Sequence, residues 1–194
     1  MNMEKKFELT DNFIINAFGV KLFQIKCTKS FKYAKEGDLG GYVEKDENLD
    51  QESDAWVSGN AQVSGNARVY GNAQVSGNAR VYGNARVYGN ARVSGNAEVS
   101  GDAEVSGNAR VSGDAEIDNN NKHCGFDCFG SANRHTHAYL TKENKVEITC
   151  GCFRGSIEEF EKRVEETHSG TIYEKQYKAI IDVLKIKFGL TDLI

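Results

Sequence analysis

The chain has 194 residues, enough for one or two small domains, and a formal net charge of −4 at neutral pH. This nearly neutral, slightly acidic balance argues against a general nucleic-acid-binding protein, and no apolar run is long enough to cross a membrane. The five cysteines, an odd number in a chain without a signal peptide, favour a reducing cytoplasm over a disulfide-bonded secreted protein.

Residues 1–40 are predicted to form a small N-terminal β cap. The segment 20–26 alternates apolar and polar side chains as a strand does, and residues 13–15 supply an antiparallel partner across a turn at 16–19. A cap is required here because the end of a stacked repeat exposes unpaired backbone groups and an open core.

Residues 41–118 read as thirteen consecutive hexads without an insertion, of which the first two are degenerate. The typical hexad is Gly-Asn-Ala-x-Val-x. Its Ala and Val stand two apart, so in an extended strand both point to one side and the flanking residues point to the other. The Gly-Asn pair takes the corner, since Gly accepts positive φ without steric cost and Asn tolerates it. A fixed period of this kind indicates a stacked solenoid.

These hexads resemble the hexapeptide-repeat left-handed β-helix proteins, in which three hexads form one triangular coil. Together with the sequence Gly-Asp-Leu-Gly-Gly-Tyr-Val at 37–43, they resemble the YdcK-like repeat proteins of bacteriophages and prophages. The resemblance covers about residues 18–118. It implies a β-solenoid, a single-stranded left-handed β-helix of about four coils, and assembly as a homo-oligomer, with a trimer favoured. It implies no particular activity.

A coil of three hexads places each position n over position n+18, so outward side chains form ladders. One ladder brings two arginines over each other, with two tyrosines beside them. Like charges repel at this spacing, whereas guanidinium planes and tyrosine rings together suit a nucleotide or another planar anion. The alternative is a solvated face whose Arg and Tyr were copied together by tandem duplication. The candidate ligand-binding residues of the repeat are Arg68, Tyr70, Arg80, Tyr82, Arg86 and Tyr88.

Residues 119–194 break the period and are predicted to form a small α+β C-terminal domain after a polar link at 118–122. The segments 137–140 and 145–150 read as a hairpin. Ser156 and Glu159 form a capping box that begins a helix ending near 168–170. A second helix follows, because apolar side chains recur on one helical stripe. That stripe consists of Tyr173, Tyr177, Ile180, Leu184 and Phe188.

The motifs at 130–139 and 150–156 resemble a C-terminal domain of phage-encoded proteins from Gram-positive hosts, over residues 129–188. In that family the first motif reads closer to Gly-Ser-Arg-Asn-x-Thr, and here an alanine replaces its arginine. The loop 130–136 and the turn 153–155 are predicted to bring Arg134, His135 and Arg154 to a helix N-terminus, which is a suitable place for an anion. The alternative is an ordinary hydrogen-bonded cap.

The C-terminal region also contains seven cysteine and histidine residues whose spacings could supply tetrahedral zinc ligands. The spacings match no known zinc-finger series, so we favour small thiols that pack a thin domain, and we expect no metal or other cofactor. The seven residues are His123, Cys124, Cys128, His135, His137, Cys150 and Cys152.

Residues 41–118 contain no histidine. Acyltransferases and zinc carbonic anhydrases of the hexapeptide class need one on or beside the coils, so the general base of that chemistry is missing. We therefore expect a non-enzymatic phage or prophage binding protein, a counter-defence or host-takeover factor that binds a host protein or sequesters a small anionic ligand such as a nucleotide. Two alternatives stay open: a structural spacer or virion component, and a transferase-like enzyme with its site in the C-terminal domain.

Overall fold

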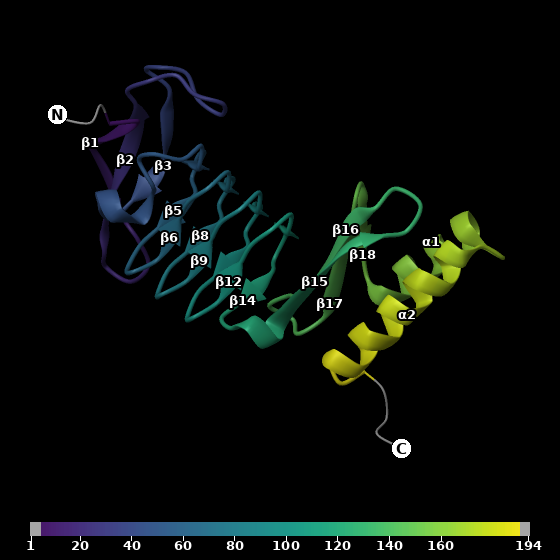
Figure 1. Cartoon of the computed structure of the whole chain (residues 1–194). Helices are drawn as coiled ribbons and strands as arrows, with labels where there is room; N and C mark the ends of the chain where they lie inside the picture. The colour runs from purple at the N-terminus through teal and green to yellow at the C-terminus, as the bar shows by residue number, and fades with distance from the viewer. Residues whose placement is uncertain (1–4, 191–194) are drawn as a thin grey trace. The chain divides into compact units, whose positions relative to one another are not determined.

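The computed structural model describes residues 5–190 and divides into two compact units, Met1–Asn120 and Asn121–Ile194 (Figure 1). The first four residues of the predicted cap and the last four of the predicted C-terminal domain lie outside the described residues. None of the helices within the described range is long and apolar enough to cross a membrane.

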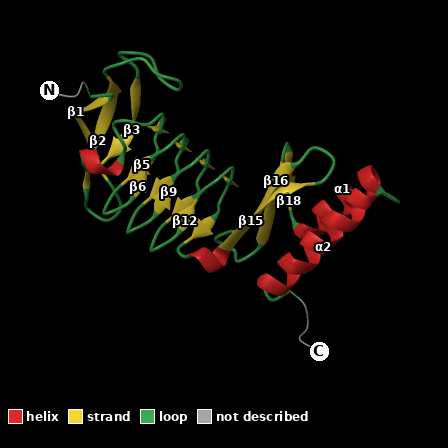
Figure 2. Ribbon diagram, in the orientation of Figure 1, coloured by secondary structure: helices red, strands yellow, loops and turns green. Residues whose placement is uncertain are grey.

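The first unit is a β-solenoid of about four coils, in which short strands alternate with corners (Figure 2). One face consists of β4 (Trp56–Val57), β7 (Gln74–Val75), β10 (Arg92–Val93) and β13 (Arg110–Val111). A second consists of β6 (Arg68–Val69), β9 (Arg86–Val87) and β12 (Glu104–Val105). The third consists of β5 (Gln62–Val63), β8 (Arg80–Val81), β11 (Glu98–Val99) and β14 (Glu116–Ile117).

The strands within each face are parallel, and from Trp56 onward each residue lies over the residue eighteen positions further along the chain. Arg68 pairs with Arg86 and Val69 with Val87, and the other two faces have the same register. The Ala and Val of every hexad are buried and fill the interior, as the pattern predicts. The predicted ladders are therefore confirmed for this part of the solenoid.

The glycine and the asparagine of each corner have different structural roles. The corner glycines have positive φ, between 57° and 71°, whereas no corner asparagine does. The corner asparagines from Asn60 to Asn96 instead donate a side-chain amide hydrogen to the residue one coil above, as from Asn72 Nδ2 to Asn90 Oδ1 at 3.0 Å. Asp102 and Asp114 serve as acceptors in the same positions. Asparagine thus belongs to the repeat because of its amide ladder, and the predicted tolerance of positive φ is not used.

The first coil departs from the predicted register. Val43 lies over Val63 and Leu49 over Val69, an offset of twenty residues, so the expectation that n lies over n+18 through all thirteen hexads is wrong for the first two. The two additional residues are accommodated in the corner at 50–55. Because an offset of two keeps the strand parity, Val43 and Leu49 still point inward and are buried.

The N-terminal cap extends the third face of the solenoid. Strands β1 (Phe7–Ile15), β2 (Lys21–Cys27) and β3 (Leu39–Val43) are antiparallel, and β3 pairs with β5 in parallel. The predicted hairpin is confirmed, with Ile14 opposite Leu22. The cap covers the open end of the interior with buried side chains of Phe7, Leu22 and Ile25.

The second unit is a four-stranded antiparallel sheet with two helices against one face. The strands are, in order, β15 (His123–Phe129), β16 (Arg134–Leu140), β17 (Val146–Cys150) and β18 (Phe153–Gly155). The helices are α1 (Ile157–His168) and α2 (Ile172–Lys187). Two short 3-10 helices also occur in the chain: η1 (Asp46–Asn48) in the first unit, and η2 (Asn120–Lys122) at the boundary between the two units. The predicted hairpin, both helices and the Ser156 capping box are confirmed, whereas β15 and β18 have no counterpart in the sequence prediction.

The stacked corners give a matched pair of glycines for testing the coil spacing. A Cβ at Gly89 would lie 2.9 Å from the backbone nitrogen of Gly107 in the next coil, whereas a Cβ at Gly107 would meet nothing within 4 Å. Both positions have positive φ. We expect Gly107→Ala to cost about 1–2 kcal/mol from backbone strain alone. Gly89→Ala should cost about 2–4 kcal/mol, because a steric overlap is added. Urea unfolding measures both, and equal costs would contradict the close stacking.

Candidate functional site

A pocket of about 1180 Å³ opens in the first unit, where the first coil and the cap meet the β6–β9–β12 face. The solenoid contributes Arg68, Tyr70 and Arg86. The other walls come from the segment 46–54, which includes the enlarged corner, from residues 29–31 and from the start of the chain. Three of the predicted ligand-binding residues therefore lie in one concave site.

The solenoid uses one arrangement of Arg, Tyr and Glu twice. Glu98 Oε1 pairs with Arg80, and Glu98 Oε2 accepts from the Tyr82 hydroxyl at 3.2 Å. One hexad further along, Arg86 Nη1 and the Tyr88 hydroxyl each donate to Glu104 at 3.2 Å. In both cases the acid stands eighteen residues after the arginine, directly above it. The repeat therefore neutralises its own arginine wherever an acid occupies that position.

At Arg68 the acid is missing. The residue eighteen positions on is Arg86, so two guanidinium groups follow each other on this face. The Arg68 side chain is exposed and makes no hydrogen bond or ion pair with any described residue, while Arg86 already has Glu104. The Tyr70 ring stacks on the Tyr88 ring, with centroids 4.9 Å apart and planes 2° from parallel. Burial and the neighbouring Tyr88 raise the pKa of Tyr70, so its hydroxyl remains a donor at neutral pH.

Arg80 and Tyr82 lie outside this pocket. The hairpin of the cap reaches over them, and the Phe18 ring packs on the Tyr82 ring at 5.2 Å between centroids. The Arg80 guanidinium group and the Tyr82 hydroxyl both already donate to Glu98. The structure thus separates the six candidates of the repeat. Arg68 and Tyr70 line the pocket without an acid above them, whereas the pairs Arg80–Tyr82 and Arg86–Tyr88 each belong to a completed arrangement.

The enlarged corner is held in place by a buried lysine. Lys6 Nζ donates to the backbone oxygens of Asp50, Ser53 and Ala55 at 2.6, 2.7 and 2.8 Å, which uses all of its hydrogens. The ammonium also lies 5.1 Å from the centroid of the Phe31 ring. Burial lowers the pKa of Lys6 to about 8, although the nearby Asp50 carboxylate acts in the opposite direction.

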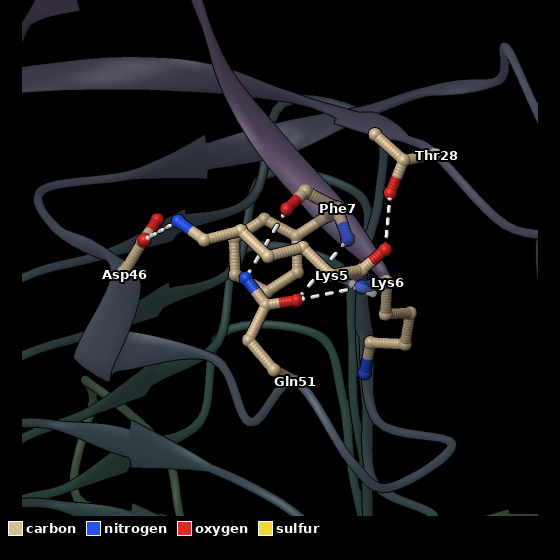
Figure 3. Close-up of polar contacts among 6 residues, drawn as sticks. All are labelled: Lys5, Lys6, Phe7, Thr28, Asp46 and Gln51. Atoms are coloured by element: carbon tan, nitrogen blue, oxygen red, sulfur yellow. Dashed lines mark hydrogen bonds and ion pairs between the residues drawn. The ribbon is translucent and has the colours of Figure 1, made fainter. Parts of the chain in front are cut away.

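Side chains on the same segment join it to β1 (Figure 3). The Gln51 amide oxygen accepts from the backbone nitrogens of Lys6 and Phe7 at 2.8 and 3.2 Å, and its nitrogen donates to the Phe7 oxygen at 3.1 Å. Lys5 Nζ pairs with the Asp46 carboxylate at 2.5 Å. The pocket wall is therefore fixed by contacts between residues more than forty positions apart in the sequence.

This wall is acidic. Asp46 is engaged by Lys5, and Asp50 accepts hydrogen bonds from the backbone nitrogens of Glu52 and Ser53. Burial raises the pKa of Asp50, but the hydrogen bonds from Ser53 and Glu52 outweigh it and hold that pKa below its usual range. The remaining carboxylates of the pocket are Glu47, Glu52 and Asp54. The lining of the site thus combines an arginine and a tyrosine from the solenoid with several carboxylates from the segment 46–54.

In the second unit, the structure does not bring Arg134, His135 and Arg154 together. Arg134 and His135 are consecutive in β16 and point to opposite faces of the sheet. Arg154 makes a two-point contact with Glu147, with Nε at 2.5 Å from Oε1 and Nη2 at 3.1 Å from Oε2. The N-terminus of α1 is already occupied by Ser156 and Glu159 of its capping box.

Three of the four histidines of the second unit gather on one face of its sheet, whereas His168 ends helix α1. His123 Nδ1 lies 3.0 Å from His137 Nε2, and His135 Nδ1 lies 2.7 Å from Asp127 Oδ1. Among the described residues, no group of three or more His, Cys, Asp or Glu side chains is arranged to hold a metal ion. All five cysteines are free thiols, and Cys150 packs in the core between the sheet and the helices.

Sequence reasoning found the solenoid side of the pocket and missed the rest of it. Lys6 and Phe31 were not candidates because they lie in segments without a repeat or a motif, and Gln51 was not because its hexad is degenerate. One signal was available: acids crowd the degenerate hexads at 44–54, where the pattern loses its Ala and Val. The segment in which the pattern is lost includes the enlarged corner, where the chain departs from the regular coil.

The Lys6 contact predicts a measurable effect on stability. Lys6→Met leaves three backbone carbonyl groups without their donor, one of them fully buried and two partly buried, and we expect a loss of about 2–3 kcal/mol at pH 7. The folded pKa, about 8, lies below the ordinary value of 10.5, so the unfolded chain binds the proton more readily between these values. Raising the pH through this window therefore favours the folded wild type over the variant.

Urea unfolding of both proteins at pH 7, 8.5 and 9.5 provides the measurement. Lys26→Met, the same change at an exposed position of β2, is the matched control and should stay within about 0.5 kcal/mol of wild type. A Lys6→Met chain as stable as wild type would contradict the assigned role of this ammonium group.

Comparison with known protein families agrees with the repeat architecture. The family described as the YdcK beta solenoid repeat matches three overlapping stretches, residues 61–77, 73–89 and 85–101. These stretches include Arg68, Tyr70, Arg86 and Tyr88. No curated protein matches the chain. The central coils are thus similar to the YdcK beta solenoid repeat, and the similarity extends over less than half of the sequence.

Proposed function

We propose that this chain is a non-enzymatic binding protein whose first unit holds a small anionic ligand with a planar ring, of the nucleotide class. The observation that carries the proposal is the incomplete Arg–Tyr–Glu arrangement at Arg68. The solenoid supplies an acid above Arg80 and above Arg86, but not above Arg68. Arg68 and Arg86 both line the pocket, and of these two Arg68 is the one without an acid above it. A ligand anion would complete the arrangement.

The groups on the solenoid side fit a phosphate and a ring. Arg68 can offer two parallel N–H groups to a phosphate, which is the geometry that guanidinium favours. The Tyr70 ring lies beside it in a stack with Tyr88 and carries a hydroxyl that is protonated at neutral pH. A stacked tyrosine pair is a flat, rigid surface of the kind on which bases pack.

The acidic wall selects against a bare anion. Glu47, Glu52 and Asp54 would repel a phosphate that approached them, but they can accept hydrogen bonds from the amino groups and ring N–H groups of a base. A nucleotide presents both features, with its phosphate at one end and its donors at the other. The pocket, about 1180 Å³, is large enough for such a ligand.

The chemistry of the pocket favours holding a ligand over transforming it. Among the residues that the structure describes, its lining contains no histidine or cysteine, so it offers neither an imidazole base nor a thiol nucleophile. We further propose that the protein works in a phage-infected or lysogenic bacterial cell, as a counter-defence or host-takeover factor that sequesters a nucleotide signal. The repeat and the C-terminal motifs that resemble phage proteins support this role.

Calorimetric titration of the full chain tests the ligand. The probes are adenosine 5′-monophosphate and a panel of cyclic mono- and dinucleotides, with inorganic phosphate and adenosine titrated separately. At least one nucleotide should bind more tightly than phosphate or the nucleoside alone, because each of these reaches only one side of the pocket. Arg68→Ala should weaken binding at least about tenfold, since a charge-assisted hydrogen bond contributes about 1.5–3 kcal/mol.

Arg92→Ala is the matched control. Arg92 stands under Arg110 on another face of the solenoid, so it also belongs to a pair of stacked arginines, but it is flanked by Ser94 instead of a tyrosine and lies outside the pocket. Its loss should leave nucleotide binding unchanged. Failure of every nucleotide in the panel to bind would contradict the proposal and leave the structural spacer as the better interpretation of the solenoid.

A further inference from the structure

Helix α2 carries two apolar stripes. One stripe packs into the core of the second unit and consists of Tyr177, Ile180, Ile181 and Leu184. The other stripe faces solvent and consists of Ile172, Ala179, Val183 and Ile186. Three of its side chains are large and strongly exposed: Ile172 to 61%, Val183 to 48% and Ile186 to 67%. A helix that needed only one contact would present polar residues there.

The exposed stripe has the spacing of a helix–helix contact. Its members are separated by seven, four and three residues, the heptad spacing that aligns side chains along one line of a helix. At 3.6 residues per turn the four positions fall within about 60° of one another. The stripe is flanked on one side by Lys175 and Asp182, both exposed, and neither makes a hydrogen bond or ion pair with the residues that the structure describes.

We propose that this stripe binds a second copy of this chain, with the two α2 helices packed antiparallel about a twofold axis that passes near Ala179. The antiparallel arrangement sets Ile172 against the partner's Ile186, and Ile186 against the partner's Ile172. The smallest side chain of the stripe then lies at the crossing point, where the two backbones come closest. A twofold contact needs a surface that complements itself, and this stripe meets that condition.

The flanking charges support the same arrangement. Antiparallel packing about Ala179 places Lys175 beside the partner's Asp182, and the symmetry repeats this pair on the other side of the axis. Both residues are otherwise unused within the described part of the chain. The two helix dipoles also oppose each other in this orientation, which is favourable. A parallel pair would instead align the dipoles and set Lys175 and the partner's Asp182 at different heights along the helices, so the two charges would not meet.

A single helix pair buries less area than a standard stable interface, so we expect a dimer in concentration-dependent equilibrium with monomer. Sedimentation equilibrium of the full chain over a wide concentration range measures its dissociation constant. Ile186→Glu should weaken self-association at least tenfold without loss of helix content by circular dichroism. Ile15→Glu, at a similarly exposed isoleucine in β1 of the first unit, is the matched control and should leave the constant unchanged.

Charge reversal tests the orientation. Lys175→Asp and Asp182→Lys should each weaken the dimer, because each places two like charges together, and the double variant should restore it. Wild type that stays monomeric at every concentration reached would overturn the proposal. So would an assembly that is indifferent to Ile186→Glu, since the contact would then lie elsewhere, for example between solenoids. A double variant that is not restored would overturn the antiparallel arrangement.

Discussion

The backbone ladder between successive coils is the constraint on which the first unit depends. Each coil donates its amide hydrogens to the next, as from Arg68 N to Ala85 O at 3.0 Å and from Tyr70 N to Val87 O at 3.1 Å. From Trp56 onward, this ladder fixes each outward side chain directly beneath the residue eighteen positions later. The neighbours of an arginine are therefore decided by the sequence one coil away. When an arginine stands in place of the glutamate eighteen residues later, the ion pair is lost and the first arginine keeps an uncompensated positive charge.

The Arg68 position shows what this constraint implies for function. Tandem duplication would copy arginine and tyrosine together, and this accounts for their recurrence. It does not account for the positions of the acids. Glu98 and Glu104 neutralise Arg80 and Arg86, whereas Arg68 has no acid above it and lines a pocket that also contains several carboxylates. The stacked Arg92 and Arg110 show that a solenoid tolerates adjacent arginines without a tyrosine or a pocket. The combination at Arg68 is thus more specific than the charge stacking alone.

Sequence reasoning succeeded where structure follows from local or periodic rules. The Tyr70–Tyr88 stack follows from the period, the first hairpin from strand alternation, and α1 from its capping box. It failed where distant segments meet. The contacts of Lys6 with the corner at 50–55 join residues more than forty positions apart, and no periodicity encodes them. It also misassigned the corner asparagines, because their amide ladder exists only once the coils are stacked.

The pocket lies where the period fails, and there is a physical reason for this. A regular prism has flat faces, because identical coils repeat the same outward profile, so a concave site needs a segment that departs from the repeat. Here the departures are the two additional residues of the first coil and the loop that carries Phe31, and a buried ammonium group holds the enlarged corner in place. The regular coils contribute a rigid, ordered row of charged and aromatic side chains to this pocket. In a repeat protein of this type, the degenerate units are therefore the segments in which to seek the binding site.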